Sequence, residues 1–348
     1  MKCPSRRAPV FLKMSRTSDC MPQRFTQMAL PSTPIFLSQS HTDPEILTTE
    51  ITKNTEEDRS VFEFYVISVV NFTMKYLLVD NGSLRPQSVL NLRAIAAELG
   101  RETGLEILPS SLLHSSKVPV DQLEGEPAVN LERRLRLFLE AGEREFTILP
   151  FFFGPTGAIT EYLPQRLAYR REKHGDFSIR LAPFLSLGED QDNSDLVQIL
   201  ADNVRQSMAY NSWKRPRVVL VDHGSPMPEV TDVRNALAME LEAALGSEVE
   251  AVAPASMERR EGEAYAFNEP LLENLLRTPP WNDGPVVISM LFLSPGRHAG
   301  PGGDIATICR EAREENPGLR TSMTGLVGEH PGIVAVLRRR LGMPMVDI

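Results

Sequence analysis

The sequence predicts an α/β protein with two tandem domains, each built on a parallel sheet, and a cleft between them. Three observations support this prediction. The tetrapeptide Asp80-Asn-Gly-Ser83 returns 142 positions later as Asp222-His-Gly-Ser225. Apolar runs typical of fully buried strands alternate with amphipathic helical patterns. This alternation occurs four times in each half of the chain, and it indicates parallel strands joined by right-handed helical crossovers.

The internal repeat extends beyond the tetrapeptide. At the same offset of 142 positions, residues of the following helix return in order, with Pro86, Ala94, Ala96, Glu98 and Leu99 matching Pro228, Ala236, Ala238, Glu240 and Leu241. Self-similarity at a fixed spacing indicates duplicated structural units. We therefore expect a first domain at residues 74–210, a linker at 211–217 and a second domain at 218–348.

Each expected domain consists of four strand–helix units. In the first domain, strands are expected at residues 75–80, 105–109, 145–152 and 177–184, and helices near 86–100, 128–141, 160–172 and 192–208. In the second, strands at 218–222, 249–254, 286–293 and 319–326 alternate with helices near 226–246, 268–278, 302–315 and 331–341. Apolar residues that share one helical face support the helices, as Val89, Leu92, Ile95 and Leu99 do in the first of them.

Residues 1–73 differ from the rest of the chain. They are rich in Ser, Thr and Pro and show neither a helical nor a strand period, which is typical of a disordered segment. Because Met74 opens the first clear strand, we expect either a disordered leader or a mis-assigned start codon.

Composition excludes several classes of protein. The formal net charge of −9, with no long basic run, argues against nucleic-acid binding, and the apolar runs are too short to span a membrane. The cysteines Cys3, Cys20 and Cys309 form no CxxC motif, so neither a disulfide framework nor an iron–sulfur cluster is expected. We expect a cytoplasmic protein whose two fused domains could act as a monomer.

Two histidines follow strands of the second expected domain. His223 comes directly after the strand at 218–222, and His298 lies in a glycine-rich segment after the strand at 286–293. Ligands of open α/β sheets bind outside the carboxyl ends of the strands, so both imidazoles are expected at one crevice. Such a pair can hold a divalent metal or accept protons near neutral pH. Two protein ligands leave the coordination sphere open, which suits an ion that is passed on.

These motifs resemble those of the class II tetrapyrrole chelatases. The resemblance rests on Asp222-His-Gly-Ser225, on Glu269-Pro270 and on the loop from Phe292 to Asp304, and it covers residues 74–345. It implies two chelatase-like domains of flavodoxin-like or Rossmann-like fold that face each other. It also implies a sirohydrochlorin cobaltochelatase or ferrochelatase, which inserts Co²⁺ or Fe²⁺ without ATP in cobalamin or siroheme biosynthesis. Its partners would be the tetrapyrrole and the divalent metal.

The resemblance also assigns roles to single residues. The family's histidine pair falls on His223 and His298, which would serve as metal ligands and proton acceptors, and Glu269 would assist proton removal. The substrate's carboxylates need cationic or N–H partners. The residues expected to bind them are Ser225, Arg297, Gly300, Gly302 and Gly303.

The first expected domain lacks the histidines. Asn81 stands where the second domain has His223, and residues 154–160 contain no counterpart of His298. This degenerate copy would form a wall for the macrocycle. It also favours an alternative, a non-catalytic tetrapyrrole or metal carrier. A further alternative is a phosphate- or nucleotide-binding enzyme that uses the glycine-rich loop, although the sequence has neither a Walker motif nor GxGxxG.

Overall fold

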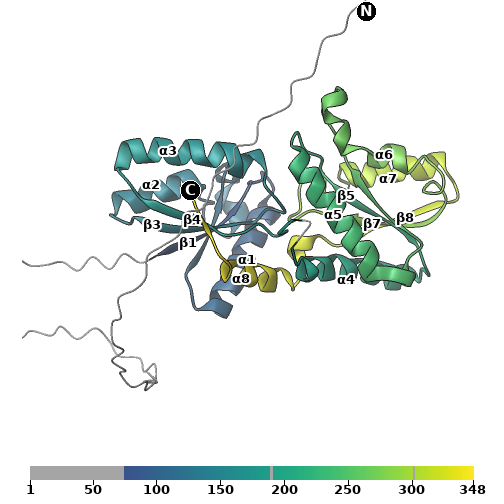
Figure 1. Ribbon diagram of the computed structural model, residues 1–348, viewed down its shortest axis with the longest axis horizontal. Coiled ribbons are helices and arrows are strands. Elements are labelled where there is room, and N and C mark those ends of the chain that lie inside the picture. The colour runs from purple at the N-terminus through teal and green to yellow at the C-terminus, as the bar shows by residue number, and fades with distance from the viewer. Residues whose placement is uncertain (1–73, 189–190, 301) are drawn as a thin grey trace, which may run out of the picture. The chain divides into compact units, whose positions relative to one another are not determined.

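The structure is a computed structural model that describes residues 74–188, 191–300 and 302–348 (Figure 1). The chain divides into the units Met1–Ile67 and Ser68–Ile348, and every element below belongs to the second unit. The expectations for residues 1–73 lie outside the described residues. The predicted α/β class with parallel sheets is confirmed. The predicted domain limits stay a prediction, and we refer to residues 74–210 as the amino-terminal half and to 218–348 as the carboxyl-terminal half.

The described residues form two sheets that share one strand order. The first has the order β2-β1-β3-β4-β9, with β1 Lys75–Asp80, β2 Ile107–Ser111, β3 Glu145–Pro150, β4 Ser178–Leu181 and β9 Val346–Asp347. The second has the order β6-β5-β7-β8, with β5 Arg217–Asp222, β6 Val252–Ser256, β7 Gly284–Met290 and β8 Leu319–Met323. Pairing is parallel except between β4 and β9. The order changes direction beside β1 and beside β5, and ligands bind at such switch points.

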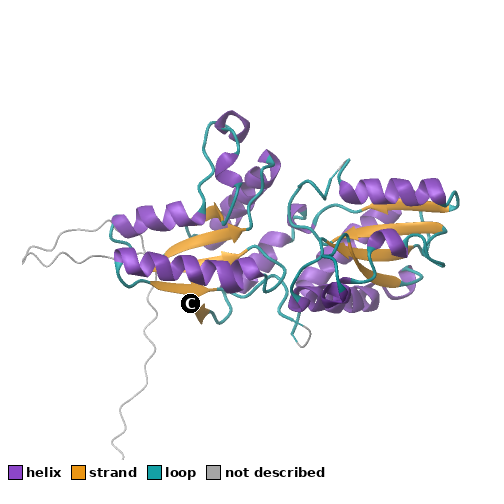
Figure 2. Cartoon of the chain, turned by 90° about the horizontal axis from the view of Figure 1, so that it is seen from above, coloured by secondary structure: helices purple, strands orange, loops and turns teal. Residues whose placement is uncertain are grey.

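Helices cover both faces of each sheet (Figure 2). The amino-terminal half contributes α1 Pro86–Thr103, α2 Leu131–Glu140, α3 Leu163–His174 and α4 Ser194–Asn211. The carboxyl-terminal half contributes α5 Pro228–Leu245, α6 Leu272–Leu275, α7 Asp304–Glu315 and α8 Ile333–Leu341. Strand alternation divides the apolar side chains between the two faces. Leu77 packs with α2 and α3, whereas its neighbour Leu78 joins the core formed with α1, α4, α5 and α8.

The last helix of each half packs on the other half. α4 contacts α5, β7 and β8, and α8 contacts α1 and β3. Buried Arg340 of α8 fixes this exchange, because its guanidinium donates to the Asp195 carboxylate at 2.9 and 3.1 Å and to the carbonyls of Phe184 and Leu185. The prediction of two self-contained strand–helix series did not include this exchange. An amphipathic stripe shows that a helix is buried on one side and does not specify which sheet it covers.

Most elements differ from their expected limits by a few residues, and two edge strands and one helix show why. β2 and β6 begin two to three residues later than the runs at 105–109 and 249–254, because both pair in register with the central strand up to its last residue, Asp80 with Ser111 and Asp222 with Ser256. The helix expected at 268–278 is only α6, Leu272–Leu275. The short strand β9 was not predicted.

Within the described ranges, we find no helix that combines the length and the apolar character needed to cross a bilayer.

Candidate active site

A cleft of about 330 Å³ lies at the carboxyl ends of β1, β3, β5 and β7. Both halves line it. The amino-terminal half contributes Asp80 to Ser83, Ser88, Phe151 to Gly154 and Thr156. The carboxyl-terminal half contributes His223, Val230, Leu291 to Gly296, His298 and Ala299. The cleft therefore lies at the switch points of both sheets, where their topology predicts a ligand site.

Two reciprocal contacts hold the loops around the cleft. The side-chain amide of Asn91 on α1 donates to the Gly328 carbonyl at 3.1 Å and lies 3.4 Å from the Ser294 hydroxyl. On the other side, Val233 of α5 packs so closely on Gly154 that an added Cβ there would come within 2.8 Å of its Cγ2. Each half thus uses its long helix to fix a cleft loop of the other half.

His223 extends from the end of β5. Its Nδ1 lies 3.1 Å from the Gly224 carbonyl, and its Nε2 lies 3.5 Å from Oε1 of Glu258. The side chain is 47% exposed. Gly224 makes this loop possible, because its φ of +92° is in the left-handed region and a Cβ would lie 1.9 Å from the Glu258 carbonyl oxygen. Gly82 has the same conformation in the amino-terminal half, where a Cβ would lie 1.8 Å from the Leu113 carbonyl oxygen.

His298 lies in the loop between β7 and α7. Its Nδ1 is 2.6 Å from Oδ2 of Asp304, the first residue of α7. A proton on Nδ1 that is donated to this carboxylate leaves a lone pair on Nε2, which is the arrangement of most metal-binding histidines. The loop must be tight to bring the two residues together. At Gly303 a Cβ would be 2.8 Å from the His298 carbonyl oxygen.

The structure brings the two predicted histidines together. The ring centroids of His223 and His298 are 4.6 Å apart and the ring planes are inclined by 74°. The described residues contain no cluster of three or more His, Cys, Asp or Glu side chains suited to a metal. The pair is thus an open two-imidazole site with the Glu258 carboxylate at its side, a donor set that suits divalent first-row metals.

A buried polar network supports the His223 loop from below. Arg234 of α5, only 1% exposed, donates to the Ser256 hydroxyl and to the Asn268 carbonyl, and its Nη1 lies 3.7 Å from Asp222. Ser256 donates in turn to Asp222 at 2.6 Å. Burial raises the pKa of the Asp222 carboxyl, while the hydrogen bond from Ser256 and the charge of Arg234 act in the opposite direction. Asn268 accepts a hydrogen bond from Ser225 N at 2.9 Å and so anchors the loop.

The sequence analysis missed Glu258, Asp304 as a partner of His298, and this network. The sequence could have identified Asp304 as a partner of His298, because this acid lies six positions after His298 and begins the next helix. Glu258 lies outside any motif used for the prediction.

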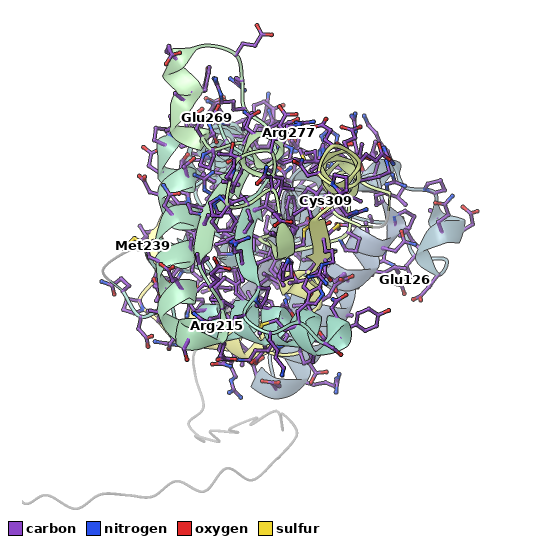
Figure 3. The ribbon with its side chains drawn as sticks, turned by 90° about the vertical axis from the view of Figure 1, so that its right-hand side faces the viewer. Glu126, Arg215, Met239, Glu269, Arg277 and Cys309 are labelled. Atoms are coloured by element: carbon purple, nitrogen blue, oxygen red, sulfur yellow. The ribbon has the colours of Figure 1, made fainter. Side chains whose placement is uncertain are left out.

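Other predicted residues lie outside the histidine pair. The Glu269 carboxylate accepts from Arg259 at 2.8 Å and from the backbone N–H of Leu271 at 2.9 Å (labelled in Figure 3). The Ser225 hydroxyl accepts from Met227 N at 3.0 Å and does not line the cleft. The proposed roles of Glu269 and Ser225 therefore stay predictions that no contact to the cleft supports.

Arg297 and the glycine-rich turn lie beside the cleft. Arg297 is 81% exposed, with its Nε 3.7 Å from Asp304. With Gly300, Gly302 and Gly303 it lines a hollow of about 170 Å³ that also includes Arg85 of the amino-terminal half. These residues are thus available at the rim for a negatively charged group.

Among the described residues of the amino-terminal half, none that lines the cleft is a histidine. Asn81 occupies the cleft position that matches His223, and Phe151, Phe152 and Phe153 provide an apolar wall. Asp80, which also lines the cleft, is buried, and its Oδ1 has no hydrogen-bond partner among the described residues. Burial raises the pKa of this carboxyl to about 6.

Comparison with known proteins supports this description. The CbiX family model matches residues 217–343. SirB from Bacillus subtilis with Fe³⁺ has a similar fold, with 15% sequence identity, a TM-score of 0.55, and coverage of 77% of this chain and 94% of that chain. The sirohydrochlorin chelatase SirB from Bacillus subtilis subspecies spizizenii in complex with cobalt is similar at 16% identity, with the same TM-score of 0.55 and the same coverage of 77% and 94%. No curated protein matches the chain in sequence.

These matches confirm the predicted resemblance to the class II chelatases. Residues 217–343, which carry both histidines, match the CbiX family model, and the described chain has the fold of the SirB structures.

Proposed function

We propose that the protein is a sirohydrochlorin chelatase that inserts Co²⁺ or Fe²⁺ into its substrate without ATP. The observation that carries this proposal is the pair of imidazoles, His223 and His298, with ring centroids 4.6 Å apart at the edge of an apolar cleft. The family match of the half that carries this pair supports the same conclusion. Imidazole accepts both metals, so the proposal covers both and leaves the siroheme and cobalamin pathways equally open.

The cleft offers what metal insertion requires. Phenylalanine and leucine side chains on both walls suit the faces of a flat conjugated ring. The reaction exchanges two pyrrole N–H protons for one divalent cation, so the site must deliver the metal and accept two protons. His223 and His298 would hold the ion through Nε2. Glu258 beside His223 is placed to accept one proton, and an imidazole that has released the ion to the ring would accept the other. Arg297 at the rim would pair with a substrate carboxylate.

Metallation of sirohydrochlorin by the purified full-length protein tests the proposal. The absorbance change with Co²⁺ or Fe²⁺ is compared with the spontaneous rate, for the wild type and for His223→Ala and His298→Ala. We expect acceleration that falls to nearly the spontaneous rate in both variants. His174→Ala, which removes an imidazole at the end of α3, is the matched control and should keep the full rate. Full activity in both cleft variants would refute the proposal.

The carrier function remains the second candidate, because the amino-terminal half supplies Asn81 where a second metal ligand could stand. The same assay separates the two functions. A carrier binds sirohydrochlorin or the metal with no acceleration of their reaction, whereas a chelatase accelerates it. A phosphate- or nucleotide-binding function is less favoured, because the Asp304 carboxylate lies at the start of α7, where it competes with an anion for the helix N-terminus.

A further inference from the structure

A second cavity, of about 480 Å³, lies in the amino-terminal half beside the edge strand β2. It shares no lining residue with the histidine cleft. Its walls are α1, strand β2, the loop at 126–129 and the start of α2, and the residues are Val89, Leu92, Arg93, Leu108 to Ser111, Glu126 to Val129 and Arg134. The loop segment that carries Glu126 projects from this half (Figure 3), and Glu126 itself is exposed.

Two guanidinium groups border this cavity. Arg93 donates to the carbonyls of Leu123 at 3.0 Å and Glu126 at 2.8 Å, and Arg134 donates to the Pro109 carbonyl at 3.1 Å. In the described part of the chain, neither arginine forms an ion pair within 4.0 Å. Carbonyl oxygens thus fix the position of both cations and leave their charge uncompensated at close range.

Two buried polar atoms at the cavity also have no partner among the described residues. They are Oγ of Ser110, a residue only 2% exposed, and Nε of Arg134. A buried donor without an acceptor costs free energy, and native structures seldom tolerate it without a ligand, an ion or water. Each of the two groups is a donor that an oxygen-bearing ligand would satisfy. Burial lowers the pKa of Arg134, the nearby charge of Arg93 acts in the same direction and Glu106 opposes it.

The carboxyl-terminal half shows how the corresponding space is filled. Arg234 stands 142 positions after Leu92, and it reaches from α5 to Ser256 at the end of β6 and to Asn268 in the following loop. The matching residues in the amino-terminal half are Ser111 at the end of β2 and Pro127, and both line the cavity. Pro127 lies three positions before Asn130, which pairs with Ser111, just as Asn268 lies three positions before Leu271, which pairs with Ser256. The shorter Leu92 leaves open the space that an arginine occupies in the other half.

We propose that this cavity is a binding site for a small organic anion, in which a carboxylate or phosphate group contacts Arg134, Arg93 and Ser110. The apolar side chains of Val89, Leu92 and Pro127 would cover the rest of the ligand. The cavity volume is within the range of about 300–1,000 Å³ found for small-molecule sites. The site is independent of the proposed chelatase reaction, since it is built from different residues.

Isothermal titration of the full-length protein with succinate and, separately, with inorganic phosphate tests this site. We expect saturable binding of at least one probe at millimolar concentration, and the stronger probe identifies the preferred anion group. Arg134→Gln removes the charge and should weaken binding by about tenfold or more, because hydrogen bonds to charged groups are strong. Arg136→Gln is the matched control, since it removes an exposed arginine from the same helix and should bind as the wild type does.

A second variant tests the cavity itself. Leu92→Arg copies the residue found at Arg234 and should fill the space, so the probe should no longer bind. No saturable binding of either probe to the wild type would overturn the proposal. An equal loss of affinity in Arg134→Gln and Arg136→Gln would also overturn the proposal, because binding would then depend on the net charge of the protein and not on a specific site. Undiminished binding in Arg134→Gln contradicts it even when Leu92→Arg does not fold.

Discussion

His298 and Asp304 form the shortest contact at the candidate metal site, with 2.6 Å between Nδ1 and Oδ2. Because Asp304 is the first residue of α7, the helix fixes the carboxylate and the carboxylate fixes the ring. The imidazole is thereby held in one orientation before any metal arrives. A preoriented ligand loses less conformational entropy when the ion binds, and this is the physical reason why such outer partners affect metal affinity.

Asp304→Asn is expected to lower metal affinity and metallation rate by about 10–100-fold. The amide can donate to Nδ1, which moves the ring proton to Nε2 and removes the lone pair that binds the metal. Cobalt titration and initial metallation rates would measure the loss. Glu311→Gln on the same helix serves as the control, since its exposed side chain lies beside Arg310, about two helical turns beyond Asp304. An Asp304→Asn protein with unchanged cobalt affinity would rule out this role.

Glu258→Gln is expected to slow metallation by about 100-fold or more, in the range of general acid–base catalysis, with a smaller effect on cobalt binding. Glu258 lies 3.5 Å from Nε2 of His223, where a carboxylate can accept a proton from the substrate. The measurement compares kcat with the dissociation constant for cobalt.

Glu269→Gln is the matched comparison for that variant. Its carboxylate is bound to Arg259 and to Leu271 N, so we expect nearly full activity and a stability loss of about 1 kcal/mol or less, as for other partly exposed ion pairs. If Glu269→Gln lost activity and Glu258→Gln kept it, the carboxylate that accepts the proton would be Glu269 and not Glu258.

Much of the fold and the histidine pair could be predicted from the sequence, and the reason is local. Strand ends are marked by the change from Val218-Val-Leu-Val221 to Asp222-His-Gly, and parallel topology places all such ends on one edge. That argument brought His223 and His298 together without coordinates.

The remaining features depend on packing between distant segments. Glu258 approaches His223 because β6 pairs with β5 in register up to Ser256, and the sequence analysis placed that strand too early. The exchange of α4 and α8 was beyond prediction for a similar reason. Both helices have a buried face, and only the three-dimensional arrangement decides which sheet that face covers.

Arg234→Leu is expected to destabilise the protein by about 3–5 kcal/mol, because it leaves Asp222 as a buried charge without its cation. Urea unfolding measures the loss. The double variant Asp222→Asn with Arg234→Leu removes both charges and should be less destabilised than the sum of the single variants. Additive losses would show that the two side chains do not act together. Leu92 at the matching position shows that this helix site can hold leucine.

Asp80→Asn should change the way stability depends on pH. Burial raises the pKa of Asp80 from an ordinary value of 3.8 to about 6. Between these values the native state keeps a proton that the unfolded chain has released, so wild-type stability falls as pH rises through this window. The shift corresponds to about 3 kcal/mol. The asparagine side chain of the variant does not titrate, so relative to the wild type the variant should gain about that amount between about pH 4 and pH 7.

Urea unfolding at the two ends of this pH window measures that gain, and Leu92→Arg provides an independent check of its cause. The introduced guanidinium would stand where Arg234 approaches Asp222 in the other half, and its charge would favour the ionised form of Asp80. The pH dependence of stability should therefore shrink in Leu92→Arg, because Asp80 then ionises more easily in the native state. In Asp80→Asn it disappears because the side chain no longer titrates. If the wild type and Asp80→Asn lost stability in parallel across the window, Asp80 would not be the group that titrates there.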